Sequence, residues 1–123
     1  MDICTQTRHL ANTMGILKAV DLLAEAGYTA LDISFTSAPS FHRQDNYSLV
    51  VDELIRRREA YGIKYIQAHA PFHWSINTLF DELVPEYPRV FEIAGRLGVE
   101  SIVVHPIQNA EVERYRTNGE SLF

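Results

Sequence analysis

The sequence contains a single cysteine, Cys4, and no long apolar run. One cysteine excludes an internal disulfide, and no segment reaches the roughly 18 consecutive apolar residues that indicate a membrane span. The N-terminal residues MDICTQTRHL also lack the basic-then-apolar order of a secretory signal peptide. We therefore expect a cytoplasmic protein without a membrane segment.

Positive charge is also scarce, because 11 Lys and Arg stand against 16 Asp and Glu and the formal net charge is −5. A protein that holds a nucleic-acid backbone usually carries a basic surface, so the charge balance argues against nucleic acid as a partner. The arginine run 56–58 lies late in a predicted helix, where cations interact favourably with the helix dipole. We interpret it as a solvated helix end.

The composition is that of a folded globular domain. Hydrophobic residues make up 46% and charged residues 22% of the chain, close to the averages for such domains. A length of 123 residues suits one domain, so residues 1–123 are predicted to share a single core.

Three segments that begin at a glycine align with one another: GYTALDIS from Gly27, GIKYIQAH from Gly62 and GVESIVVH from Gly98. The glycines are 35 and 36 residues apart, and each follows a stretch with helical periodicity. Glycine commonly ends a helix in this way. Each segment therefore predicts a helix, a glycine and a short strand.

The predicted helices begin at Asn12 or Thr13, at about residue 48, and just after residue 88, and a further strand is expected in residues 2–7. Repeated units of helix and strand are typical of successive βα units, which form a parallel sheet. The sequence thus predicts α/β architecture with about four parallel strands and three helices.

The two faces of this sheet are predicted to differ. Side chains alternate along a strand, and one face carries the apolar residues Leu31, Ile33, Ile66, Ala68, Ile102 and Val104. The other face is largely polar and carries Asp32, Ser34, Gln67, His69, Val103 and His105. Helices cover both faces of a doubly wound sheet but only the outer face of a (β/α)8 TIM barrel, so the pattern favours the barrel.

A complete barrel typically needs about 250 residues, so the chain is expected to form about half of one. A half-barrel leaves open strand edges and an uncovered face, which invite association. We expect either the N-terminal half of a longer protein or a half-barrel that pairs as a homodimer or with a separate C-terminal half.

The segments GYTALDISF, IKYIQAHAPF and IAGRLGVESIVVHP resemble the xylose isomerase-like TIM barrel superfamily, which includes sugar phosphate isomerases and epimerases and the apurinic-site endonucleases. The resemblance implies a divalent metal (Mn, Mg, Co or Zn) at the C-terminal mouth of the complete barrel. It also implies that most metal ligands and the catalytic acid and base come from later strands. The 123-residue chain is therefore expected to be inactive as an isomerase by itself.

The resemblance places His69 and His105 at the histidines that end the third and fourth strands, where they contact substrate or the metal. Alternatively, His69 and His105 are polar residues that form hydrogen bonds to the neighbouring backbone and do not belong to a site. Asp32 and Gln67 face the same way and either contact substrate or belong to an interior polar network.

His73 and Trp74 are further candidates, as loop residues near the mouth of the site. Pro71 argues against a helix there, so the spacing of His69 and His73 does not indicate a helical metal pair. His42, in the loop after the second strand, is expected at the surface.

These observations predict part of a sugar (phosphate) isomerase or epimerase that moves protons beside a carbonyl and acts on a small sugar or polyol. One alternative is a zinc-dependent phosphodiesterase of the apurinic-site type, with His69 and His105 as zinc ligands. The other is a non-catalytic half-barrel that acts through association.

Overall fold

The computed structural model describes residues 1–37, 40–72 and 79–105. Its strands are β1 (Cys4–Gln6), β2 (Ala30–Ser34), β3 (Lys64–His69) and β4 (Ser101–Val103). They form one parallel sheet in the order β1-β2-β3-β4. The predicted α/β class and the four parallel strands are confirmed.

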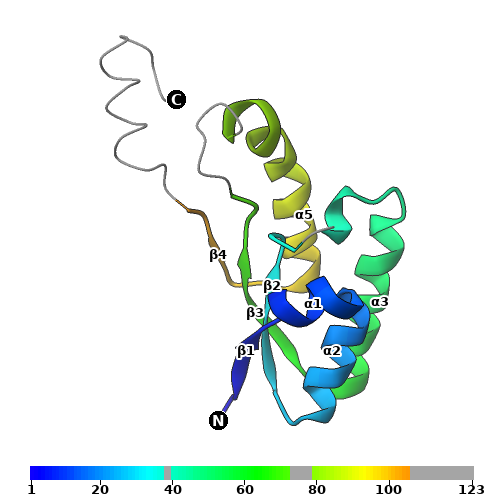
Figure 1. Ribbon diagram of the computed structural model, residues 1–123. Coiled ribbons are helices and arrows are strands. Elements are labelled where there is room, and N and C mark those ends of the chain that lie inside the picture. The colour runs from blue at the N-terminus through cyan, green and yellow to red at the C-terminus, as the bar shows by residue number, and fades with distance from the viewer. Residues whose placement is uncertain (38–39, 73–78, 106–123) are drawn as a thin grey trace.

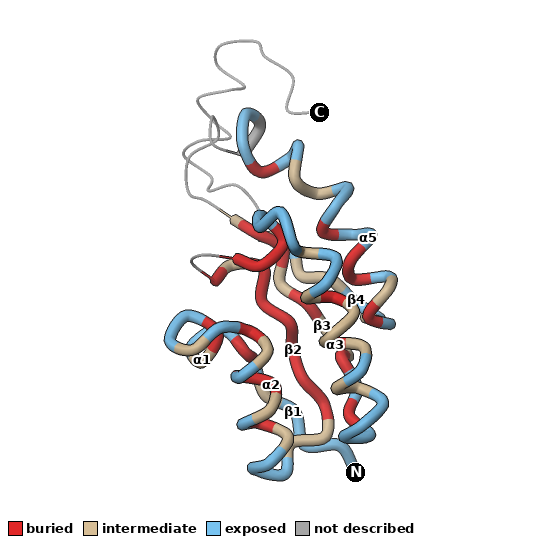
Figure 2. Tube along the Cα trace, turned by 90° about the vertical axis from the view of Figure 1, so that its right-hand side faces the viewer, coloured by how far each residue is buried: buried red, intermediate tan, exposed pale blue. Residues whose placement is uncertain are grey.

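The helices α1 (Arg8–Met14), α2 (Ile16–Glu25), α3 (Tyr47–Tyr61) and α5 (Tyr87–Leu97) connect the strands, with shorter turns η1 (Phe41–Arg43), η2 (Leu79–Leu83) and η3 (Val84–Glu86). Figure 1 shows the four α-helices on one side of the sheet, and the view in Figure 2 agrees. No described helix covers the other side. None of the helices in the described ranges is long and apolar enough to cross a membrane.

The prediction of a single first helix was wrong. Gly15 has a φ of +85°, which ends α1 and makes Gly15 the N-cap of α2. Asn12 and Thr13 therefore lie inside α1 instead of capping a longer helix. The predicted glycine ends are confirmed at Gly62 and Gly98, which both adopt the left-handed conformation after α3 and α5.

The core lies between the sheet and this helical layer. Leu31 and Ile33 of β2 are fully buried there, together with Val20 of α2, Leu54 of α3 and Ile93 of α5. Figure 2 shows β2 buried along its whole length behind the helices. Each such side chain contributes roughly 1.5–3 kcal/mol when fully buried, so helix packing fixes β2 and the residues at its end.

Candidate functional site

Asp32, Gln67 and His69 meet on the face of the sheet that the helices leave uncovered. Gln67 Nε2 donates a hydrogen bond to Asp32 Oδ2 at 2.7 Å. His69 Nδ1 lies 3.0 Å from Asp32 Oδ1 and 2.9 Å from Oδ2. The Asp32 residue is 5% exposed, whereas the His69 side chain is 30% exposed. The carboxylate is thus a buried support for a histidine that reaches solvent.

An irregularity in β3 brings these three residues together. Leu31 pairs with Tyr65, but Asp32 pairs with Gln67, so one extra residue, Ile66, is inserted between them. Tyr65 turns toward the helices, where it is buried and its hydroxyl donates to the Leu54 carbonyl oxygen at 2.6 Å. Tyr65 therefore takes the core place that strict alternation gave to Ile66, while the predicted core place of Ala68 is confirmed.

Thr7, directly after β1, holds the backbone at Asp32. Its backbone N–H and its hydroxyl both donate to the Asp32 carbonyl oxygen, at 3.0 and 2.9 Å. The same hydroxyl accepts a hydrogen bond from the Ser34 N–H at 3.1 Å. Thr7 is fully buried. The hydrogen bonds from Thr7, at the end of β1, therefore fix the backbone that carries the Asp32 carboxylate.

His105 lies next to His69, although the two are not paired across the sheet in the way that their equal distances from the preceding glycines had indicated. His69 pairs with Val103 across the sheet, so His105 is two residues further on, beyond the end of β4. The rings of His69 and His105 are nevertheless 5.9 Å apart between centroids. The Phe72 ring lies 4.2 Å from that of His105. Val104, predicted on the apolar face, is 48% exposed because β4 ends before it.

The hydrogen bonds define which nitrogen of His69 is available for chemistry. An ionised carboxylate only accepts hydrogen bonds, so Asp32 selects the tautomer in which Nδ1 carries the proton. Nε2 then presents a lone pair to a metal ion, a substrate hydroxyl or a proton. Supporting carboxylates hold metal-bound and catalytic histidines in this way.

A complete metal site does not lie among the described residues, because no three His, Cys, Asp or Glu side chains come together there. His69 and His105 offer at most two imidazoles, and a zinc site usually takes three or four protein ligands. His73 and Trp74 lie outside the described residues. The structure thus brings together Asp32, Gln67, His69 and His105 of the predicted site residues.

A second histidine cluster was missed. His42 is 1% exposed, not at the surface as predicted. Its Nδ1 lies 2.6 Å from Ser40 Oγ and its Nε2 lies 2.6 Å from Glu86 Oε2. Arg43 Nε donates to the same carboxylate at 3.0 Å, and Arg89 donates to the His42 carbonyl oxygen at 3.1 Å.

This cluster contains the three residue types of a Ser-His-Glu catalytic triad, but its serine is not accessible to a substrate. Ser40 is also 1% exposed and its hydroxyl is already paired with the buried His42, so it is not presented to a substrate. Burial lowers the pKa of His42, outweighing the opposing effect of Glu86. Burial by itself would raise the pKa of Glu86, but hydrogen bonds from His42 and Arg43 lower it overall. A neutral His42 thus donates from Nε2 to Glu86 and accepts at Nδ1 from Ser40, which indicates a structural clamp.

The three arginines at positions 56–58 all form ion pairs or hydrogen bonds with other residues of the protein. Arg57 Nε contacts Asp21 at 2.8 Å and Arg58 donates to the Leu97 carbonyl oxygen at 2.9 Å. Arg56 pairs with Glu53 on the exposed surface of α3. These contacts argue against a phosphate-binding patch. Only Arg56 is solvated as predicted, because Arg57 and Arg58 join α3 to α2 and α5.

No protein-family model matches the chain, and no curated protein or solved structure matches it either. The function is therefore inferred from the geometry around Asp32 and His69.

Proposed function

We propose that the chain forms one wall of the active site of a sugar or sugar-phosphate isomerase or epimerase built on a (β/α)8 barrel. The observation that carries this proposal is the Asp32–His69 pair with the His105 ring 5.9 Å away, at the C-terminal ends of neighbouring parallel strands. Active sites of TIM barrels lie at those ends, on residues that face inward. The sequential strand order and the one-sided helical layer support the barrel.

The proposed task of these residues is to bind and orient a small polyhydroxy substrate. His69 Nε2 accepts a hydrogen bond from a substrate hydroxyl, because Asp32 keeps the proton on Nδ1. The Phe72 ring packs against His105 and limits the positions that its imidazole adopts. Gln67 completes the wall and shares the Asp32 carboxylate with His69.

A divalent cation at such a site would polarise the substrate carbonyl oxygen and ease removal of the neighbouring proton. His69 and His105 fit this role only as two ligands of a larger set. Additional carboxylate or imidazole ligands are required from outside the described residues, so we assign neither the acid nor the base to this part of the chain.

The proposal is tested by recording long-range ¹H–¹⁵N imidazole spectra while Mn²⁺ or a ketose phosphate is added. We expect Mn²⁺ to broaden the His69 and His105 signals and the sugar to shift them, and we expect His69→Ala to remove both effects. His9 is exposed on α1 and is not a residue of the proposed site, so His9→Ala is the matched control. Equal perturbation of His9, or an unchanged His69 signal with both ligands, would refute the proposed site.

A second candidate, association, is favoured by the strand edges. Among the described residues, β1 pairs only with β2 and β4 pairs only with β3, so each offers an unpaired edge. Sedimentation or size-exclusion mass distinguishes the cases. A dimer whose formation fails when Gln6 in β1 is replaced by proline would support association through that edge. The Thr7 N–H donates to the Asp32 carbonyl oxygen of β2, so by alternation the neighbouring Gln6 N–H points to the open edge, and proline removes that donor. A stable monomer would exclude a homodimer.

A further inference from the structure

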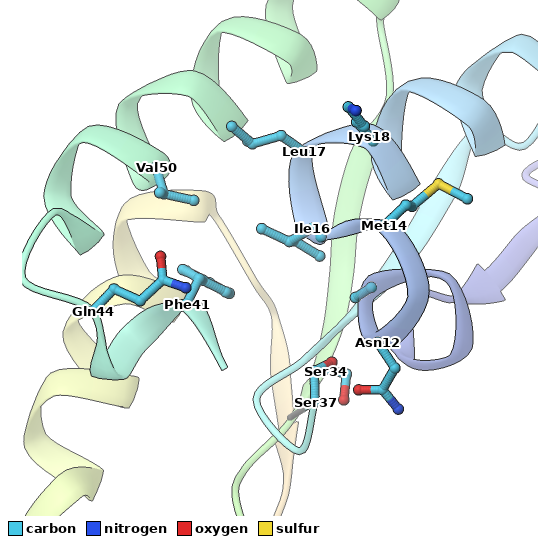
Figure 3. A pocket seen from close by; sticks show the side chains of 12 residues that line it. Asn12, Met14, Ile16, Leu17, Lys18, Ser34, Ser37, Phe41, Gln44 and Val50 are labelled. Carbon is cyan, nitrogen blue, oxygen red and sulfur yellow. The ribbon is translucent and has the colours of Figure 1, made fainter. Parts of the chain in front are cut away.

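A cavity of about 440 Å³ lies between α1 and α2 on one side and η1 and α3 on the other. Figure 3 shows Ile16 and Leu17 on one wall and Phe41 and Val50 on the opposite wall, with Ser34 and Ser37 at one end. Small-molecule sites typically enclose roughly 300–1,000 Å³ and combine apolar walls with a few polar groups. None of Asp32, Gln67 and His69 lines this cavity, so it is distinct from the candidate site.

The first turn of α2 faces this cavity, and its N-cap residue is a glycine. Residues 15–18 contribute to the lining, and Gly15 has no side chain that could cap the helix with a hydrogen bond. The first N–H groups of a helix lack intrahelical partners and carry partial positive charge. Lys18 is the charged residue among the described lining side chains, and no carboxylate lies among them. The electrostatic environment therefore favours an anion.

Ser37 gives an independent sign that a ligand is missing. It lines the cavity, is only 6% exposed, and its Oγ has no hydrogen-bond partner in the described part of the chain. Such orphaned hydroxyls are rare, because a buried polar group without a partner costs roughly 1–3 kcal/mol. The neighbouring Ser34 hydroxyl, by contrast, is paired with Thr36 at 2.6 Å.

We propose that this cavity binds a small carboxylate with an apolar body, such as a short-chain fatty acid. The carboxylate accepts hydrogen bonds from Ser37 and from the free N–H groups that begin α2. The apolar body packs between Ile16 and Leu17 on one wall and Phe41 and Val50 on the other. The carboxylate of the ligand supplies the hydrogen-bond partner that the Ser37 hydroxyl lacks. The apolar walls of the cavity favour a ligand with an apolar body over a simple anion.

Titration of the ¹⁵N-labelled protein with hexanoate, hexanol and inorganic phosphate tests the ligand class. We expect hexanoate to shift the backbone amides of residues 15–18 and of Ser37 and Gln44. Hexanol and phosphate should each bind at least about tenfold more weakly, since each lacks one half of the recognised chemistry. Equal affinity for hexanoate and hexanol, or shifts confined to other regions, would overturn the proposal.

Two variants locate the site. Val50→Phe fills the cavity and should weaken hexanoate binding at least tenfold. Leu49→Phe, at the neighbouring residue that is 66% exposed and absent from the lining, is the matched control and should bind normally. Unchanged binding by a folded Val50→Phe protein would overturn the assignment.

The variant Ser37→Ala tests the proposed carboxylate site even if Val50→Phe fails to fold. Removing an unpartnered hydroxyl does not threaten stability, but it should weaken hexanoate binding about tenfold and hexanol binding by less, because a hydrogen bond to a carboxylate is stronger than one to an alcohol. Unaltered hexanoate affinity would contradict the role of Ser37. The measured amide signals belong to residues 15–18 and 37, so the result does not depend on whether Asp32 and His69 form the proposed active site.

Discussion

His42 and His69 are both paired with a carboxylate, yet their surroundings give them different capabilities. Both nitrogens of His42 are occupied, by Ser40 and Glu86, and the side chain is 1% exposed. His69 uses Nδ1 for Asp32 and is 30% exposed. A histidine with both nitrogens bonded in the interior joins segments of the chain. A histidine with one nitrogen held and its ring accessible is prepared to bind a ligand.

The largest expected effect comes from breaking the His42 clamp. His42→Ala leaves the Ser40 hydroxyl buried and without its His42 partner, and it removes one of the two links from η1 to Glu86, the other being made by Arg43. We expect the free energy of unfolding to fall by about 2–3 kcal/mol, the cost of orphaning buried polar groups. Urea unfolding monitored by circular dichroism measures this loss.

The matched control is His9→Ala, because His9 is exposed on the first helix. It should change the free energy of unfolding by less than about 0.5 kcal/mol. Similar stability losses in both variants would contradict the structural role of His42.

A smaller effect is expected on the pH dependence of stability. Burial lowers the pKa of His42 below its ordinary value of 6.5, so the unfolded chain takes up a proton first as the pH falls. The stability due to neutral His42 is complete above about pH 6.5 and is lost as the pH falls through the lowered pKa. Urea unfolding at pH 7.5 and 5.5 should show this loss.

His42→Gln tests the origin of that pH dependence. It should reduce the difference in unfolding free energy between the two pH values, whereas His9→Gln should leave the difference as in the wild type. A pH dependence that persists in His42→Gln would assign the titration to another group.

Truncating the accessible histidine should affect binding more than stability. His69→Ala removes one of the two hydrogen-bond donors to Asp32 while Gln67 remains. We expect a loss of about 1 kcal/mol in the free energy of unfolding, well below that of His42→Ala. A loss equal to that of His42→Ala would show that His69, too, is primarily structural.

The smallest effect is expected at the surface of α3. Arg56 pairs with Glu53, but its side chain is 74% exposed, and exposed ion pairs contribute little. Arg56→Ala should change the free energy of unfolding by less than about 0.5 kcal/mol. Arg57→Ala should cost more, because Arg57 joins α3 to Asp21 of α2 and is 21% exposed. Equal thermal shifts for the two variants would contradict this order.

The sequence predicted the strands and most helix ends, because these depend on local periodicity and on glycines such as Gly62 and Gly98 that need a left-handed backbone. It also predicted that Asp32, Gln67 and His69 share a face. It could not predict the extra residue in β3, because Tyr65 and Ile66 are both suitable for a core and only the packing against Leu54 selects between them.

Contacts between segments that are distant in the sequence could not be predicted either. His42 and Glu86 are 44 residues apart, and neither lies in the repeated βα pattern that guided the prediction. The register of His105 depends on how β4 pairs with β3, which equal spacing from a glycine does not determine. The cavity beside α2 follows from the break at Gly15, where periodicity predicted a continuous helix.

The central claim is that Asp32 holds His69 with Nε2 available, and the tautomer of His69 tests it most directly. Long-range ¹H–¹⁵N spectra at neutral pH distinguish a protonated Nδ1 from a protonated Nε2. We predict that His69 carries its proton on Nδ1 in the wild type and loses this preference in Asp32→Asn. A proton on Nε2 in the wild type, or an unchanged tautomer in Asp32→Asn, would contradict the account.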